Sequence, residues 1–145
     1  MNENFELLEH IYKDSEMACF TLSDLLDKLK EKDNKIKGTV EDILHEYEDF
    51  LETCKKELEG HDIKLESTSK MAKKGASMGI KKEVRNDNSD SSMADMLIQG
   101  IAMGSIDMEK KIKNYDEEVD KSNLKLAKDF LKFQEKSIEK LKKYL

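Results

Sequence analysis

Apolar residues recur at intervals of three and four through four long stretches of this chain, and none of its 145 residues is a proline. This interval places apolar side chains on one side of an α-helix, and proline is the residue that most strongly interrupts a helix. We therefore predict an all-α protein with helices at about 3–32, 39–59, 92–119 and 123–145. The residues expected to face the core are Leu8, Ile11, Tyr12, Ser15, Ala18, Cys19, Leu22, Leu25, Leu26 and Leu29; Val40, Ile43, Leu44, Tyr47, Leu51, Cys54 and Leu58; Leu97, Ile101, Gly104, Met108, Ile112, Tyr115 and Val119; and Ala127, Phe130, Leu131, Gln134, Ile138, Leu141 and Leu145.

The lengths of the connections predict how these helices are arranged. The turns near 33–38 and 122–123 are short, which makes the helices that they join antiparallel neighbours. The crossover at 60–91 is far longer than such a turn requires, and its helical spacing at Met71, Gly75 and Met78 predicts one short helix within it. A crossover of this length returns the chain along the whole bundle. We therefore expect a single domain, 1–145, in which the third long helix starts at the same end as the second.

Charge and hydropathy exclude several classes of function. Charged residues make up 40% of the chain, and the formal net charge is −6. This balance disfavours nonspecific binding of nucleic acid, because that binding needs a basic surface to neutralise phosphates. No apolar run is long enough to span a membrane, and the first ten residues lack the basic and then apolar order of a signal peptide. We expect a soluble, cytoplasmic protein.

Four segments carry a resemblance to a known family. They are KDSEMA around Glu16, HEYEDF around Glu46, GSIDMEKKIKNY around Glu109, and FLKFQEKSIEKL in the last helix. Together with the short, long, short order of connections, they resemble the ferritin-like superfamily, and most closely the small bacterial ferritin-like bundles of unassigned function. The resemblance extends from about Leu7 to Leu141. It implies a ferritin-like four-helix bundle with a long crossover between its second and third helices.

The resemblance also implies where a metal site would lie. A ferritin-like dimetal site takes one Glu from each of two helices and a Glu-x-x-His motif from each of the other two. Carried over position by position, its ligands are Glu16, Glu46, Asp49 and Glu109. Asp49 stands where the motif has His, and the matching positions of the last helix hold Gln134 and Ser137, which are poor metal ligands.

Two hypotheses about function follow. The first is a non-enzymatic ferritin-like bundle with an eroded metal site and no cofactor, which acts as an oligomerising or partner-binding protein. A homodimer is favoured over a cage because the chain lacks an obvious extra docking helix. The alternative is a divergent dimetal protein, holding Fe or Mn, with oxidoreductase or iron-handling activity. A buried cluster of carboxylates favours the alternative, whereas carboxylates in solvent and Gln134 hydrogen-bonded inside an apolar core favour the first hypothesis.

The crossover carries a basic patch that is interleaved with apolar residues. Two interpretations fit it: docking on an acidic partner or a membrane surface, or a helix that covers one end of the bundle and keeps its outer face soluble. The second is favoured because the apolar face is narrow. The patch comprises Lys70, Lys73, Lys74, Lys81, Lys82 and Arg85, with Met71, Met78 and Ile80 between them.

The remaining residues with chemical potential are cysteines, histidines and two glycines. Cys19 and Cys54 are expected to be two inward-facing thiols rather than a structural bridge, with a redox pair as the alternative. The three histidines, at positions 10, 45 and 61, lack the spacing of a zinc site. Gly100 and Gly104 are four residues apart, a spacing that lets another backbone approach closely, within the monomer or between copies.

Overall fold

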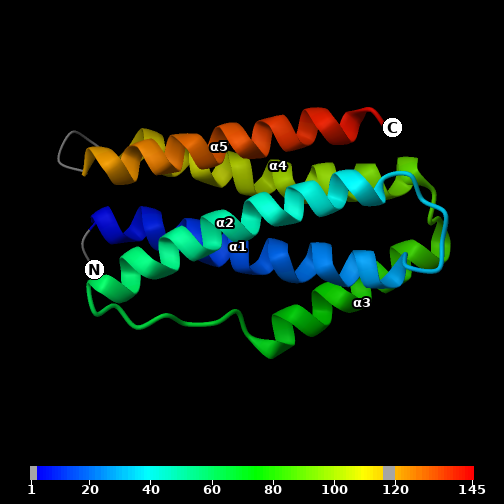
Figure 1. The fold of residues 1–145 in the computed structure, drawn as a ribbon, viewed down its shortest axis with the longest axis horizontal. Helices are drawn as coiled ribbons and strands as arrows, with labels where there is room; N and C mark the ends of the chain where they lie inside the picture. Colours follow the sequence, from blue (N-terminus) through cyan, green and yellow to red (C-terminus); the bar gives the residue numbers. More distant parts are fainter. Residues whose placement is uncertain (1–2, 116–119) are drawn as a thin grey trace.

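The computed structural model of this protein describes residues 3–115 and 120–145, and all of the regular structure in these two ranges is helical. The all-α prediction is confirmed. Five helices follow one another along the chain (Figure 1): α1 Glu3–Lys28, α2 Lys37–Gly60, α3 Lys70–Asn86, α4 Asp90–Asn114 and α5 Lys121–Lys142. None of the helices in the described ranges is long and apolar enough to cross a membrane.

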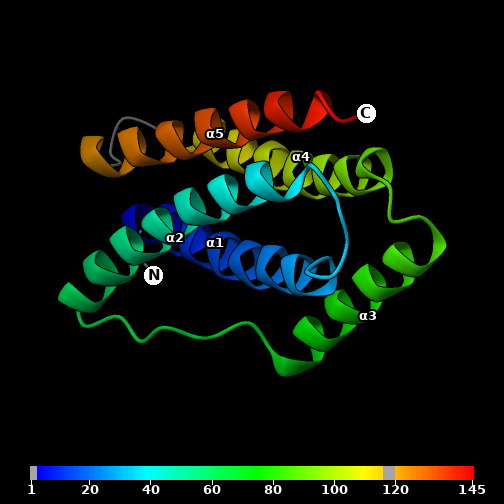
Figure 2. The same ribbon diagram turned by 45° about the vertical axis from the view of Figure 1, so that its right-hand side comes forward.

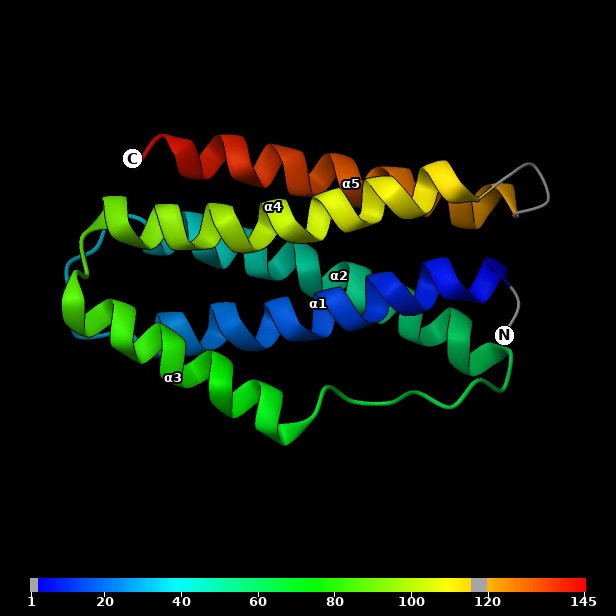
Figure 3. The same ribbon diagram turned by 180° about the vertical axis from the view of Figure 1, so that it is seen from behind.

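The long helices form two antiparallel hairpins that pack against each other. α1 pairs with α2, and α4 pairs with α5 (Figures 1 and 3). α1 is the central helix, because it contacts each of the other four. α3 lies along the outer side of α1 and also touches α4. More of the circumference of α1 is therefore buried than one apolar stripe would indicate.

The crossover returns the chain to the end of the bundle where α2 begins. After α2, residues 61–69 run back beside the bundle and α3 continues in the same direction (Figure 2). The Asn34 side-chain amide donates hydrogen bonds of 2.7 Å to the carbonyl of Asn88 and 2.9 Å to Asp90, which fixes the start of α4 beside the start of α2. The predicted order of connections is confirmed. The predicted helix within the crossover is confirmed as α3, but it has 17 residues and lies along the side of the bundle rather than over one end.

The first turn differs from the prediction at both of its ends. α1 ends at Lys28 rather than near Lys32, because no apolar residue follows Leu29 until Ile36 and the intervening residues have nothing to bury. Ile36 is fully buried in the turn and precedes α2, which begins at Lys37. Thr39 does not cap this helix; its hydroxyl lies 2.8 Å from that of Tyr144 instead.

The later helices begin earlier than predicted because nearby residues cap them. Ser89 accepts a hydrogen bond from the backbone N–H of Ser92, so α4 begins at Asp90 rather than at position 92. Asp120 accepts one from the N–H of Ser122, so α5 begins at Lys121. α4 ends at Asn114, and the predicted extension of that helix over 116–119, with Val119, lies outside the described residues.

The core follows the predicted faces closely. Most of the residues expected to face inward are buried or half-buried, although Leu145 is 62% exposed beyond the end of α5. Four aromatic rings join α2 to α5, with centroids between 4.8 and 6.1 Å apart. They belong to Tyr47, Phe50, Phe130 and Phe133. Of these four residues, Tyr47 also contacts the side-chain amide of Gln134 inside the bundle.

Candidate functional site

A hydrogen-bonded polar group lies inside the bundle where three helices meet. Gln134 on α5 is fully buried, and its side-chain amide donates a hydrogen bond of 2.9 Å to Oδ2 of Asp14 on α1. The same amide donates a weaker one, at 3.4 Å, to the hydroxyl of Tyr47 on α2. Ser137, one turn further along α5, donates to the carbonyl of Phe133 in its own helix. The inward positions of α5 therefore hold polar side chains that are hydrogen-bonded within the core.

The fourth helix makes room for this group with a glycine. A Cβ atom on Gly104 of α4 would lie 2.8 Å from Asp14 Oδ2 and 3.0 Å from Gln134 Nε2. Gly104 therefore accommodates two polar side chains, not a neighbouring backbone. At Gly100 an added Cβ would meet nothing within 4 Å. The expectation that both glycines allow close approach of a backbone was wrong within this chain.

Burial changes the acidity of this group. The pKa of Asp14 is raised to about 6: burial raises it most, the hydrogen bond from Gln134 opposes this, and the charge of Asp107 raises it to a smaller extent. Burial, followed by the charge of Asp14, also raises the pKa of Tyr47, so its phenol stays protonated. The polar group therefore contains one carboxyl group that titrates just below neutral pH.

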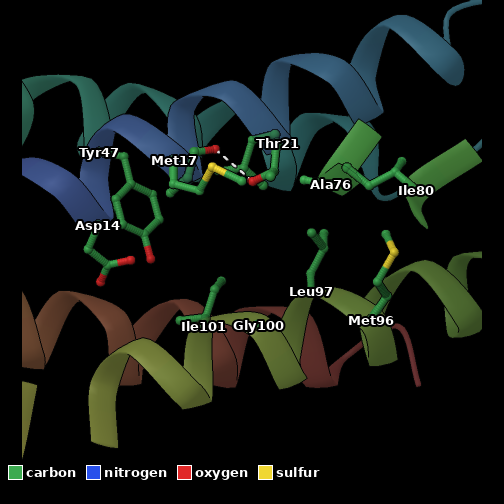
Figure 4. A pocket seen from close by; sticks show the side chains of 12 residues that line it. Asp14, Met17, Thr21, Tyr47, Ala76, Ile80, Met96, Leu97, Gly100 and Ile101 are labelled. Carbon is green, nitrogen blue, oxygen red and sulfur yellow. Dashed lines mark hydrogen bonds between the residues drawn. The ribbon is translucent and has the colours of Figure 1, made fainter. Parts of the chain in front are cut away.

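Asp14 lies at one end of an apolar cavity of about 270 Å³ (Figure 4). Asp14 and Tyr47 direct their oxygen atoms to this end, whereas Ile80 and Met96 lie at the opposite end. The walls come mainly from α1, α3 and α4. The lining residues are Asp14, Met17, Ala18, Thr21, Leu22, Tyr47, Ala76, Ile80, Met96, Leu97, Gly100 and Ile101.

A second, more polar hollow of about 490 Å³, here named the polar opening, shares Asp14 and Met17 with the apolar cavity. Besides Asp14, its acidic residues are Asp107 on α4 and Glu66 in the crossover. Its basic residue, Lys13, is already paired with Glu9 at 3.0 Å. Its other lining residues are His10, Ser67, Thr68 and Gly104.

The histidine at the polar opening carries no charge at pH 7. Burial lowers the pKa of His10, and the charge of Lys111 lowers it as well, whereas the charge of Asp107 acts in the opposite direction. The free charge at the polar opening is therefore negative.

The residues predicted as metal ligands do not come together. Glu46 and Asp49 are exposed on α2, and Glu109 is exposed on α4, where it pairs with Lys113 at 3.5 Å. Within residues 3–115 and 120–145, no three His, Cys, Asp or Glu side chains are arranged to hold a metal ion. The carboxylates of Glu46, Asp49 and Glu109 are therefore in solvent, whereas Gln134 is hydrogen-bonded inside the core.

Glu16, the fourth predicted ligand, holds the crossover against α1. One of its oxygens accepts a hydrogen bond of 2.5 Å from the N–H of Thr68, and the other accepts one of 3.2 Å from the hydroxyl of Tyr12. Burial alone would raise the pKa of Glu16, but these hydrogen bonds and the charge of Lys73 outweigh it and lower the pKa. Its observed partners make Glu16 a structural carboxylate.

The cysteines and the other two histidines do not form a reactive group in the described ranges. Cys19 and Cys54 are free thiols, as expected. Burial raises the pKa of Cys19 to about 11 and that of Cys54 to about 12, which disfavours the thiolate required for redox chemistry. His45 lies 3.1 Å from Glu48 on the surface, and the ring of His61 packs against Phe5.

Sequence reasoning missed Asp14, the residue at the centre of the site. Asp14 stands on the flank of the apolar stripe of α1, beside Ser15, and has the sequence signature of a solvated carboxylate. It becomes half-buried because α1 contacts helices on several sides. One signal was available: Gly104 and Gln134 interrupt the apolar faces of two other predicted helices, and both lie against Asp14.

Comparison with known proteins adds no further assignment. The chain matches no protein-family model, no curated protein and no solved structure. The all-α class therefore rests on the helices themselves, and the ferritin-like assignment stays a prediction.

Proposed function

We propose that this chain is a non-enzymatic, ferritin-like helical bundle that acts through its surface and pairs with a second copy of itself. The ferritin-like assignment is supported by the order of connections, with one long crossover between two antiparallel hairpins. Self-association is supported by one observation. Two helices that do not contact each other carry opposite and almost entirely unpaired charge on their outer faces.

The first of these faces belongs to α2 and is acidic. The helix has eight carboxylates against three lysines, and every one of the carboxylates is exposed. Within the described ranges, only Glu48 has an ion pair, with His45. We name this surface the acidic face; it comprises Glu41, Asp42, Glu46, Glu48, Asp49, Glu52, Glu57 and Glu59.

The second face belongs to α3 and is basic. The helix has six basic residues and one acidic residue, and it packs against the bundle through Ala76, Ile80 and Val84. We name its outer stripe the basic face; it comprises Met71, Lys74, Met78, Lys81, Lys82 and Arg85. None of its cations has a carboxylate partner among the described residues. Met71 is 84% exposed and Met78 is 63% exposed, which adds apolar contact area between the charges.

A second copy is the partner that these faces fit. α2 and α3 do not touch within one chain, so the charges of one copy are available to the opposite charges of another. In a twofold dimer the acidic face of each copy meets the basic face of the other, and the contact is formed twice. Docking on a membrane is less favourable because the apolar part of the basic face consists of only two methionines. Ile80 does not add to it, since that side chain is buried in the bundle.

The expected dimer is weak and sensitive to salt. An exposed ion pair contributes only about 0.2–1 kcal/mol, and salt screens it. Most of the stability must therefore come from burying Met71 and Met78, at about 25 cal/mol per Å² of apolar surface. We expect dissociation constants on the order of micromolar at low salt.

Charge reversal and its rescue test this proposal. Sedimentation velocity at increasing protein concentration measures the dimer in about 0.05 M and about 0.5 M salt. Lys74→Glu with Lys82→Glu reverses two of the four cations of the basic face, and Glu46→Lys with Asp49→Lys reverses two of the eight carboxylates of the acidic face. Each double variant alone is expected to be monomeric. An equimolar mixture of the two should form a heterodimer, because one contact is then unchanged and, in the other, the two new glutamates of one variant meet the two new lysines of the other.

A matched control separates a specific contact from a change in net charge. Lys132→Glu with Lys136→Glu makes the same charge change at two exposed lysines of α5 and should leave the dimer unchanged. A wild-type protein that stays monomeric at every concentration and salt level would overturn the proposal. So would a dimer that the α5 control weakens as much as the α3 variant does.

A further inference from the structure

The apolar cavity and the polar opening meet at Asp14, and neither takes part in the proposed self-association. The acidic and basic faces lie on the outer sides of α2 and α3, whereas the cavity is lined by the inner side of α3 and by α1 and α4. Ala76 and Ile80 are the contribution of α3 to the cavity. A ligand there would be bound independently of a second copy.

The shape of the cavity selects a small ligand that is apolar along most of its length. Its volume of about 270 Å³ is just below the usual range for small-molecule sites, about 300–1,000 Å³. Figure 4 shows Met17, Leu97 and Ile101 along its walls and Ile80 and Met96 at the far end. All of these side chains bury hydrocarbon readily, and the methionines adapt to the shape of a guest.

The charge at the near end selects the head group. Asp14 Oδ2 accepts the hydrogen bond from Gln134, which leaves the other carboxylate oxygen with no partner among the described residues. Asp107 and Glu66 add negative charge at the polar opening, and Lys13 is occupied by Glu9. A carboxylate ligand would therefore be repelled, whereas an ammonium group would be attracted and could donate hydrogen bonds to Asp14 and to the hydroxyl oxygen of Tyr47.

We infer that this cavity is a binding site for a small amphipathic amine, whose ammonium group pairs with Asp14 and whose apolar body extends between α1, α3 and α4 toward Ile80 and Met96. Polar recognition at one end and apolar burial along the remainder are the two features that small-molecule sites combine. Gly104 supports the site from behind, because a larger residue would displace the Asp14 carboxylate.

A series of straight-chain amines from butylamine to octylamine tests the inference by isothermal titration calorimetry. Affinity should rise about fourfold for each added methylene until the cavity is filled, because each buried methylene gains about the same free energy. Hexanol and hexanoate serve as head-group controls for hexylamine and should bind at least tenfold more weakly. The methyl resonances of Met17 and Met96 should shift on binding, whereas that of exposed Met71 should not.

Two variants locate the site. Asp14→Asn removes the charge but keeps an acceptor for Gln134, and it should weaken hexylamine binding at least tenfold. Gly100→Leu places a larger side chain where an added Cβ meets open space at the cavity wall, and it should also weaken binding.

The matched controls are Asp95→Asn, at an exposed carboxylate of α4, and Gly79→Leu, at an exposed glycine of α3. Both should bind hexylamine like the wild type. Equal binding of the amine, the alcohol and the carboxylate would overturn the inference. Hexylamine binding that Asp14→Asn leaves unchanged would do so as well.

Discussion

Gln134 on α5 donates a hydrogen bond to Asp14 on α1 across 120 positions of sequence, and this bond joins the two hairpins inside the core. Tyr47 of α2 contacts the same amide, and Gly104 of α4 leaves the space that the pair occupies. One polar group thus fixes the relative position of four helices. The free energy of unfolding of the protein therefore depends on whether Asp14 is protonated.

Replacing Asp14 by Asn should stabilise the protein at neutral pH. Burial raises the pKa of Asp14 from 3.8 to about 6 in the folded state. The folded state therefore keeps a proton that the unfolded state releases between these values, and stability present below pH 3.8 is lost as the pH rises through about 6. The free energy of unfolding of the wild type should fall relative to Asp14→Asn by roughly 2–3 kcal/mol over this interval.

Urea denaturation of both proteins at about pH 4 and about pH 7 measures this difference. Asp95→Asn is the control, since the carboxylate of Asp95 is exposed. A gap between wild type and Asp14→Asn that does not change with pH would show that Asp14 titrates normally. The other ionisable groups that face this region are Asp107, Glu66, His10, Lys13 and Tyr47. Both proteins contain these groups, so comparing the two at each pH cancels most of their contribution to the free energy of unfolding.

The two glycines of α4 should respond oppositely to alanine. Gly100→Ala should raise the free energy of unfolding by about 0.5–1 kcal/mol, because alanine favours the helix and the added Cβ meets nothing within 4 Å. Gly104→Ala should give no gain or a net loss, because its Cβ would lie 2.8 Å from Asp14 Oδ2 and would disturb the bond to Gln134. Thermal denaturation of the two variants and the wild type measures these differences. An equal gain in stability in both variants would contradict the role assigned to Gly104.

Removing the Glu16 carboxylate should release the crossover. Glu16→Ala deletes the acceptor for the Thr68 N–H, and a lost hydrogen bond of this kind costs about 1–3 kcal/mol. The amide of Thr68 should then exchange with deuterium at least tenfold faster, and trypsin should cut sooner at exposed Lys64. Glu52→Ala, at an exposed position of α2, is the control. Unchanged exchange at Thr68 would show that the crossover is held by other contacts.

Metal loading should leave the protein without a stoichiometric dimetal centre. Glu46, Asp49 and Glu109 are exposed and are not grouped with Glu16 to hold a cation, so weak surface binding is the expected limit. Elemental analysis after anaerobic loading with Fe(II) or Mn(II) checks this, with Glu46→Ala and Glu109→Ala alongside. Two metal ions per chain that both variants lose would support the dimetal alternative and count against the non-enzymatic proposal.

Sequence periodicity predicted the secondary structure well because burial of an apolar stripe is a local property of each helix. The inner faces of α1 and α2 were identified nearly residue by residue, including Cys54 and Tyr47. The helix ends were predicted less accurately, because Ser89 and Asp120 cap α4 and α5 before the predicted starts at 92 and 123. Caps depend on a few hydrogen bonds that compete at neighbouring positions.

The sequence by itself determined the all-α class and the order of short and long connections, since both follow from spacing and chain length. It also determined that Gln134 would face the core, because that residue lies on the apolar stripe of its helix. Only the tertiary structure decided that Asp14, not Glu46 or Glu109, would bind the buried amide of Gln134. The physical reason is that burial of a flanking side chain depends on how many neighbours surround its helix, and α1 alone contacts all of the others.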